Sequence, residues 1–214
     1  MSGVYTVRAG ADAHGSGVTT PSRGGPPNVH DDRGRMARAP WRQLSTRPVY
    51  ANRWIRVRED LVSLPDGATT IYGVVQCPPC IGVLPFLDHD TVVMVGQYRY
   101  VAGDFYWEIP TGAVRPGESE EVAVQRELGE EAGYEAGRLT KLCAFHTSKS
   151  IMEETASIYV AEGLRPAARE ADATEFIEVR RFAFDEAVRM VLDDEIKDAM
   201  SIIAILHVAR RRGR

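Results

Sequence analysis

Apolar residues recur along the 214-residue chain with two different periods, which divide it into predicted strands and predicted helices. Runs rich in β-branched and aromatic residues predict strands at 54–63 and 69–76, and the Pro-Asp-Gly turn between them is typical of a hairpin. Two strongly apolar runs, 81–86 and 91–96, predict a second, more buried hairpin. Further strands are expected at 107–111, 138–145, 156–161 and 176–182.

Three other segments have the features of helices. The first lies between Ser119, which suits an N-cap and precedes two glutamates, and Gly133, which suits a C-terminal stop. The apolar stripe that would seat this helix on a core consists of Val124, Leu128 and Ala132. Residues 185–192 and 196–210 predict two helices near the C-terminus, and the arginines at the end of the second complement a helix C-terminus.

The first 44 residues differ from the rest of the chain. They are rich in Gly, Ser, Pro and Arg, with few apolar residues and no period. Such a composition cannot bury enough surface to offset the entropy lost on ordering, so it predicts a disordered tail over 1–44, with Met36 as an alternative translation start. Further on, a Pro-Pro pair interrupts regular structure and separates a small N-terminal β-sheet, 45–78, from a main domain at 79–214.

Composition argues against several classes of function. A formal net charge of −4 at pH 7 is unfavourable for a partner that is a nucleic acid or an acidic membrane. The chain has no apolar run as long as a membrane span and no signal-peptide core, so we expect a cytoplasmic protein without a membrane partner. Three cysteines, Cys77, Cys80 and Cys143, suit a reducing compartment. A zinc site that joins them to His146 is disfavoured, because residues three apart on a strand point to opposite faces.

Three carboxylates gather beside the apolar stripe of the first helix. Because an α-helix turns by roughly 100° per residue, the side chains of Glu127, Glu130 and Glu131 lie within an arc of roughly 100° around its axis. Arg126 lies near Glu130 and offsets part of their repulsion, whereas Glu127 and Glu131 have no basic partner within the helix. We therefore expect positive charge from outside. Clustered carboxylate oxygens suit hard cations such as Mg²⁺ or Mn²⁺, and the alternative interpretation is a solvated acidic face.

The loop before the helix favours metal binding. Together with the helix it gives the spacing G-x5-E-x7-R-E-L-x-E-E-x-G-Y from Gly112 through Glu118 to Tyr134. This string resembles the Nudix box, although Tyr134 stands where that family usually has an aliphatic residue. The resemblance extends over roughly residues 45–208 and points to the branch of ADP-ribose pyrophosphatases and related nucleoside-diphosphate-sugar hydrolases. It implies an α+β fold, the Nudix α/β/α sandwich with a mixed sheet, preceded by a small antiparallel β-sheet.

The resemblance also implies roles for individual residues. The implied metal ligands are the carbonyl of Thr111 and the carboxylates of Glu127, Glu130 and Glu131. Arg126 would orient these glutamates, and Glu118 would brace the loop. Arg99 and Glu108 match positions that contact substrate. Two or three divalent ions would neutralise the diphosphate and lower the pKa of a bound water.

The base that activates this water is less narrowly defined. In the family it is often a glutamate in the loop before the last strand, and here several acids qualify. The candidates are Glu154, Glu170, Asp172 and Glu175, of which Glu175 is slightly favoured by motif position.

The expected reaction converts a nucleoside diphosphate linked to a sugar, plus water, into a nucleoside monophosphate and a sugar phosphate. The loop His-Thr-Ser-Lys-Ser-Ile-Met-Glu-Glu after the box lacks the proline common in ADP-ribose hydrolases, so other ADP-sugars and GDP-sugars stay open. A homodimer is implied, in which the small sheet pairs with or swaps into a second subunit. The alternatives are a nucleoside triphosphate pyrophosphatase, or a non-catalytic nucleotide-binding module of the same fold.

Overall fold

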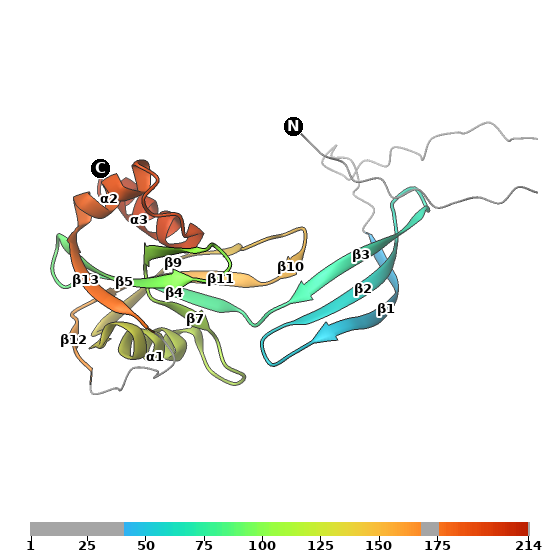
Figure 1. Cartoon of the computed structure of the whole chain (residues 1–214), viewed down its shortest axis with the longest axis horizontal. Helices are drawn as coiled ribbons and strands as arrows, with labels where there is room; N and C mark the ends of the chain where they lie inside the picture. The colour runs from blue at the N-terminus through green and yellow to red at the C-terminus, as the bar shows by residue number, and fades with distance from the viewer. Residues whose placement is uncertain (1–40, 168–175, 214) are drawn as a thin grey trace, which may run out of the picture.

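Two parts are visible in the computed structural model, which describes residues 41–167 and 176–213 (Figure 1). The smaller part is an antiparallel sheet that projects away from the main domain. Its strands, in spatial order, are β1 (Arg42–Ala51), β2 (Arg56–Ser63) and β3 (Thr69–Gln76). A two-residue strand from the main domain, β10 (Met152–Glu153), pairs in parallel with the end of β3 and extends this sheet. The expected small N-terminal sheet is therefore confirmed.

Two sheets form the centre of the main domain. The first has the order β7 (Thr111–Ala113), β4 (Cys80–Pro85), β11 (Thr155–Glu162) and β9 (Arg138–His146). It is mixed, because β4 and β11 run parallel whereas the other pairs are antiparallel. The second has the order β13 (Glu178–Ala183), β5 (Thr91–Arg99) and β6 (Asp104–Glu108). Two short strands, β8 (Tyr134–Glu135) and β12 (Arg165–Pro166), pair outside these sheets.

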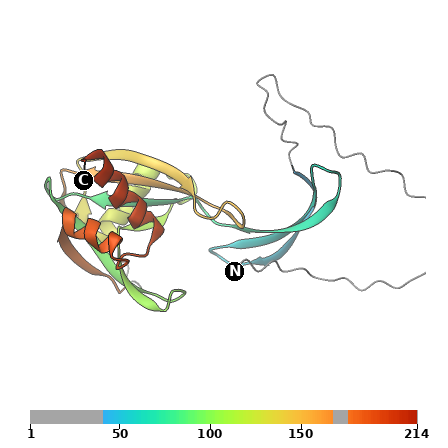
Figure 2. The ribbon, with the colours of Figure 1, turned by 90° about the horizontal axis from the view of Figure 1, so that it is seen from above.

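Helices cover both faces of these strands. On one face lies α1 (Glu120–Ala132), and on the other lie α2 (Phe184–Leu192) and α3 (Ala199–Arg211), which pass over the strands in Figure 2. Each interface has its own core. Ile81 and Val83 of β4 pack with Leu128 of α1, whereas Leu84 packs with Phe184 and the α3 residues. Because β4 is buried on both faces, its sequence is continuously apolar rather than alternating. This arrangement confirms the expected α/β/α sandwich.

The hairpin expected between residues 81–86 and 91–96 is wrong. Their turn does close, with an isolated bridge between Phe86 and Val92, but beyond it the two strands enter different sheets. β4 pairs with β7 and β11, and β5 pairs with β6 and β13. Sequential neighbours usually pair, but two strands buried on both faces each gain more by pairing with two other strands.

Three boundaries also differ from expectation. β1 includes residues 42–44, which were assigned to the tail; every residue of β1 is exposed, so it has no alternating pattern to reveal it. The predicted strand 107–111 is divided into β6 and β7, since Pro110 has no N–H for a ladder. The last helix begins at Ala199 rather than residue 196, because Asp198 provides its N-cap. Within 41–167 and 176–213, no helix is long and apolar enough to cross a membrane.

Candidate active site

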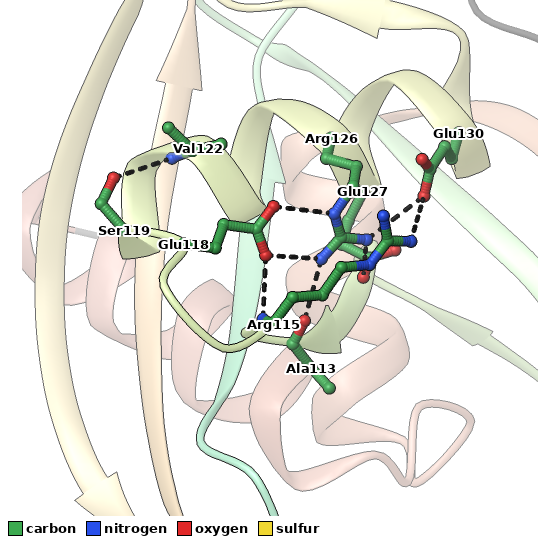
Figure 3. Close-up of polar contacts among 8 residues, drawn as sticks. All are labelled: Ala113, Arg115, Glu118, Ser119, Val122, Arg126, Glu127 and Glu130. Carbon is green, nitrogen blue, oxygen red and sulfur yellow. Dashed lines mark hydrogen bonds and ion pairs between the residues drawn. The ribbon is translucent and has the colours of Figure 1, made fainter.

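Local capping fixes the position of α1. The Ser119 hydroxyl accepts a hydrogen bond from the backbone N–H of Val122 at 3.3 Å (Figure 3). At the other end Gly133 adopts a left-handed conformation with φ of 74°, which a residue with a side chain rarely adopts. Both caps were predicted from the sequence, and both are confirmed. The helix therefore presents its acidic arc in a defined rotation above the core.

Arg126 is the centre of a buried ionic network beneath this arc (Figure 3). Its Nε and Nη2 bind the Glu118 carboxylate at 2.9 and 3.0 Å, and Nη2 also donates to the Ala113 carbonyl at 2.9 Å. Its Nη1 lies 2.5 Å from Glu127 and 3.2 Å from Glu130. The expectation that Glu127 has no basic partner within the helix is therefore wrong, because Arg126 of the same helix binds it. Neighbouring residues on an exposed helix diverge, but a buried guanidinium lies along the helix and its planar fork reaches several acceptors.

Glu118 joins the preceding loop to the helix. In addition to Arg126, its carboxylate accepts the backbone N–H of Arg115 at 2.9 Å, so one side chain closes the turn that enters α1. The Arg126 guanidinium is the main reason why the pKa of Glu118 falls to about 2. The same interaction raises the pKa of Arg126.

Acidic pH should weaken the ion pair between Glu118 and Arg126 in a defined pH range. The pKa of Glu118 is lowered on folding, from 4.5 to about 2, so its stabilising effect is complete above pH 4.5 and is lost as the pH falls towards 2. We expect Glu118→Gln to lower the free energy of unfolding at pH 6, and we expect the difference from the unaltered protein to shrink between pH 4.5 and 2. Urea unfolding followed at several pH values measures this. A difference that does not change with pH would contradict the assignment.

The carboxylates of α1 lie directly against β7. The Glu131 Oε2 accepts the backbone N–H of Thr111 at 3.0 Å. A Cβ atom added to Gly112 would lie 1.9 Å from the Glu127 Oε1, so a larger residue there would displace the Glu127 carboxylate. Two carboxylates and the backbone of residues 111–112 are thereby gathered in one place.

The donor set at this place suits a hard divalent cation. Glu127, Glu130 and Glu131 offer oxygen atoms only, which Mg²⁺ and Mn²⁺ prefer. Among the described residues no three His, Cys, Asp or Glu side chains already converge as a metal cage. The chemistry of these donors fits such an ion, and Glu131 lies against the backbone of Thr111.

Glu127, Glu130 and Glu131 are called the acidic cluster below. Arg99 and its partner Glu108 lie near it, since the Glu131 charge acts on Arg99. The Arg99 guanidinium binds the Glu108 carboxylate through Nε and Nη2 at 2.5–3.1 Å, and Glu108 is only 4% exposed. The family resemblance implies that both residues contact substrate, and the structure joins them in one ion pair. Arg99 is the last residue of β5, and Glu108 is the last residue of β6.

A cavity of about 900 Å³ opens over β7. Its walls come from both parts of the protein, and its lining includes Arg53, Trp54, Arg99, Thr111, Glu154 and Asp198. The Arg53 guanidinium stacks 4.0 Å above the Trp54 ring in the turn between β1 and β2. Cavities of this size accommodate molecules as large as a nucleotide with a second group attached.

Cys77 and Cys80 line the same cavity but are not suited to nucleophilic attack. Burial is the main cause that raises the pKa of Cys80 to about 12, and it also raises the pKa of Cys77. A thiol must lose its proton to become a strong nucleophile. Both thiols therefore stay protonated near neutral pH.

The structure places one of the candidate bases in the cavity. Glu154 lines it and accepts a hydrogen bond from the Thr147 hydroxyl at 2.6 Å. The loop that carries Glu154 is fastened to the small sheet, because Arg58 pairs with Glu153 at 2.6 Å and the Tyr72 hydroxyl donates to the Ser150 carbonyl at 2.7 Å. The other candidates, Glu170, Asp172 and Glu175, lie outside the described residues.

Sequence reasoning missed two groups at the site. The first is Arg53 and Trp54: the predicted strand 54–63 begins at Trp54, and no local pattern shows that this turn reaches the cavity. The second group joins α1 to the sheet: Glu120 accepts hydrogen bonds from Lys141 at 2.6 Å, Tyr159 at 2.7 Å and Ser157 at 3.0 Å. An acid in the first turn of a helix is visible in the sequence, but these partners depend on the tertiary fold.

Comparisons with known proteins agree with this geometry. The model of the NUDIX domain matches residues 78–202, and that of the nucleoside diphosphate sugar hydrolase N-terminal domain matches residues 41–75. Two relatives are each 32% identical over 77% of this chain and 90% of their own: the methanol dehydrogenase activator of Bacillus methanolicus and the ADP-ribose pyrophosphatase of Bacillus subtilis. A crystal structure of an ADP compounds hydrolase superimposes with a TM-score of 0.75 at 23% identity, covering 83% of this chain and 98% of the other.

Proposed function

Because this chain belongs to the NUDIX family, we propose that it is a metal-dependent hydrolase of nucleoside diphosphates linked to a sugar. The products are a nucleoside monophosphate and a sugar phosphate. The observation that carries the proposal is the cavity over β7: its walls carry arginines, and its lining includes Thr111, whose backbone N–H binds Glu131 of α1. The relative named ADP-ribose pyrophosphatase supports the same class of substrate.

Glu127, Glu130 and Glu131, with the Thr111 carbonyl, would hold the divalent cation, Mg²⁺ or Mn²⁺. When bound, such an ion neutralises the diphosphate oxygens and lowers the pKa of a coordinated water. Arg126 keeps two of the carboxylates oriented through its Nη1. Glu118 holds that guanidinium in place from the opposite side.

Cationic and aromatic groups of the cavity would bind the two ends of the substrate. Arg99 and Arg53 provide positive charge for phosphate oxygens, and Trp54, which is 63% exposed, offers a ring on which a base can stack. Glu108 holds the Arg99 guanidinium in place, which reduces the entropy lost when a substrate binds.

A carboxylate would take the proton from the attacking water, and the candidates are Glu154, Glu170, Asp172 and Glu175. We expect replacement of the true base by the corresponding amide to lower kcat by at least about 10²-fold, because proton transfer contributes that much to such reactions. Steady-state kinetics of the four single variants measures this, and the three other variants act as controls. Four variants with normal turnover would place the base elsewhere.

The small sheet would join two copies into a homodimer. Its surface carries apolar side chains that are exposed in the single chain, among them Trp41, Leu44, Val49, Tyr50 and Ile71. Exposed apolar groups in such number are typical of an association surface. Light scattering after gel filtration should give twice the mass of the chain.

The three free cysteines fit a reducing compartment, so a cytoplasmic location is part of the proposal.

A panel of ADP-sugars, GDP-sugars, dinucleotides and nucleoside triphosphates, each with Mg²⁺, tests the function through its products. Two monophosphates from a nucleotide sugar are expected. Release of pyrophosphate from triphosphates would instead identify a triphosphate pyrophosphatase.

The relative named methanol dehydrogenase activator favours a second candidate, a module that acts on a protein partner. Nucleotide binding without any product in Mg²⁺ or Mn²⁺ would support that alternative.

A further inference from the structure

A buried hydroxyl connects α3 to the segment that links β6 and β7. The backbone N–H of Ile109 donates to the Ser201 Oγ at 2.9 Å. Ser201 is fully buried, and its hydroxyl donates in turn to the Asp198 Oδ2 at 2.6 Å. The hydrogen-bond chain therefore runs from the N-cap of α3 to the residue after Glu108.

The segment 108–111 is held by both helical layers. Pro110 has no N–H, so the donors on either side of it are Ile109 and Thr111, and they bind different helices. Ile109 binds Ser201 of α3, and Thr111 binds Glu131 of α1. The segment thus lies between the acidic cluster on one face of the sheet and α3 on the other.

Capping alone does not explain the Ser201 hydroxyl. The backbone N–H of Ser201 already donates to the Asp198 Oδ2 at 2.7 Å, which completes the N-cap without the side chain. The hydroxyl adds the connection to Ile109. Packing leaves little freedom there, since a Cβ atom on Gly82 would lie 2.8 Å from Met200 of α3 and 3.0 Å from Ile109.

We propose that Ser201, held by Asp198, is a positioning residue that sets the Thr111 carbonyl and the Glu131 carboxylate for metal binding. This inference rests on the proposed function. Ser201 does not touch the donors itself; it acts through Ile109 and the rigid Pro110. Without its hydroxyl, the Ile109 N–H loses its acceptor, and the segment can move relative to α1.

Ser201→Ala tests this, and Val208→Ala is the matched control. Val208 is a core residue of the same helix, so its truncation weakens packing of α3 but leaves the hydrogen-bond chain intact. We expect Ser201→Ala to bind Mn²⁺ about 10-fold more weakly in the absence of substrate, the usual effect of losing a group that orients metal ligands. We also expect kcat to fall with little change in KM. Hydrogen exchange of the Ile109 amide should become faster.

The controls separate a positioning role from a general loss of stability. Val208→Ala should lower the melting temperature without changing Mn²⁺ affinity. Equal Mn²⁺ affinity in Ser201→Ala and the unaltered protein, or equal weakening in Val208→Ala, would overturn the inference. These outcomes leave the proposed function intact if the unaltered protein binds Mn²⁺ and hydrolyses nucleotide sugars. Failure of the unaltered protein to do either would instead refute the proposed function.

Discussion

Glu131→Gln should lower kcat by at least about 10²-fold and weaken Mn²⁺ binding while the fold stays intact. Glu131 is 7% exposed, and its Oε2 accepts the Thr111 N–H. The glutamine carbonyl oxygen can accept the same hydrogen bond, so the local structure is retained and only the charge that a cation needs is lost. Turnover with Mg²⁺, calorimetric titration with Mn²⁺ and a thermal melt measure the three quantities.

Glu121→Gln is the matched control for this substitution. It removes the same charge from the same helix, but Glu121 is exposed and lies outside the acidic cluster. Its turnover and metal affinity should match those of the unaltered protein. Full activity of Glu131→Gln would refute a catalytic role for this carboxylate.

Arg126→Met is expected to lower the free energy of unfolding by about 3 kcal/mol, the lower end of the cost of breaking a buried ion pair. Methionine fills a similar volume, but Glu118, Glu127 and Glu130 lose their shared cation. These carboxylates retain some contact with water, which keeps the effect from being larger. Urea denaturation at pH 7 measures the change.

Arg126→Lys separates charge from geometry at the same position. A single ammonium group retains the positive charge but cannot bind Glu118 and Glu127 from two sides as the guanidinium does. We expect Arg126→Lys to lower the free energy of unfolding by less than Arg126→Met does, and to reduce turnover. A lysine variant as stable as the unaltered protein would show that charge alone holds the network.

Local features of the site could be predicted from the sequence, and contacts between distant segments could not. The caps of α1 depend on Ser119 and Gly133 alone, so propensity was sufficient. The hydrogen bond from Arg126 to the Ala113 carbonyl depends on the path of the loop, which no periodicity records. For the same reason the pattern predicted that β4 and β5 are strands, but not that they enter different sheets.

The hydroxyl of Ser201 marks another limit of sequence reasoning. Its spacing from Asp198 indicates a capped helix start, and the helix begins three residues later than the predicted start at 196. Nothing in that pattern reveals that the acceptor for Ile109 lies 92 residues further along the chain. Polar contacts between distant segments can be recognised only once the fold is known. The Nudix box, in contrast, is recognisable from residue spacing within one continuous segment.

The attachment of the 147–154 loop to β3 has a consequence for how this protein can be dissected. Arg58 and Tyr72 hold that loop from the small sheet, and the Val75 N–H donates to the Ile151 carbonyl at 2.9 Å. A truncated chain that starts after residue 76 would keep the sandwich yet lose these restraints on Glu154. The amino-terminal sheet therefore belongs in any minimal catalytic fragment.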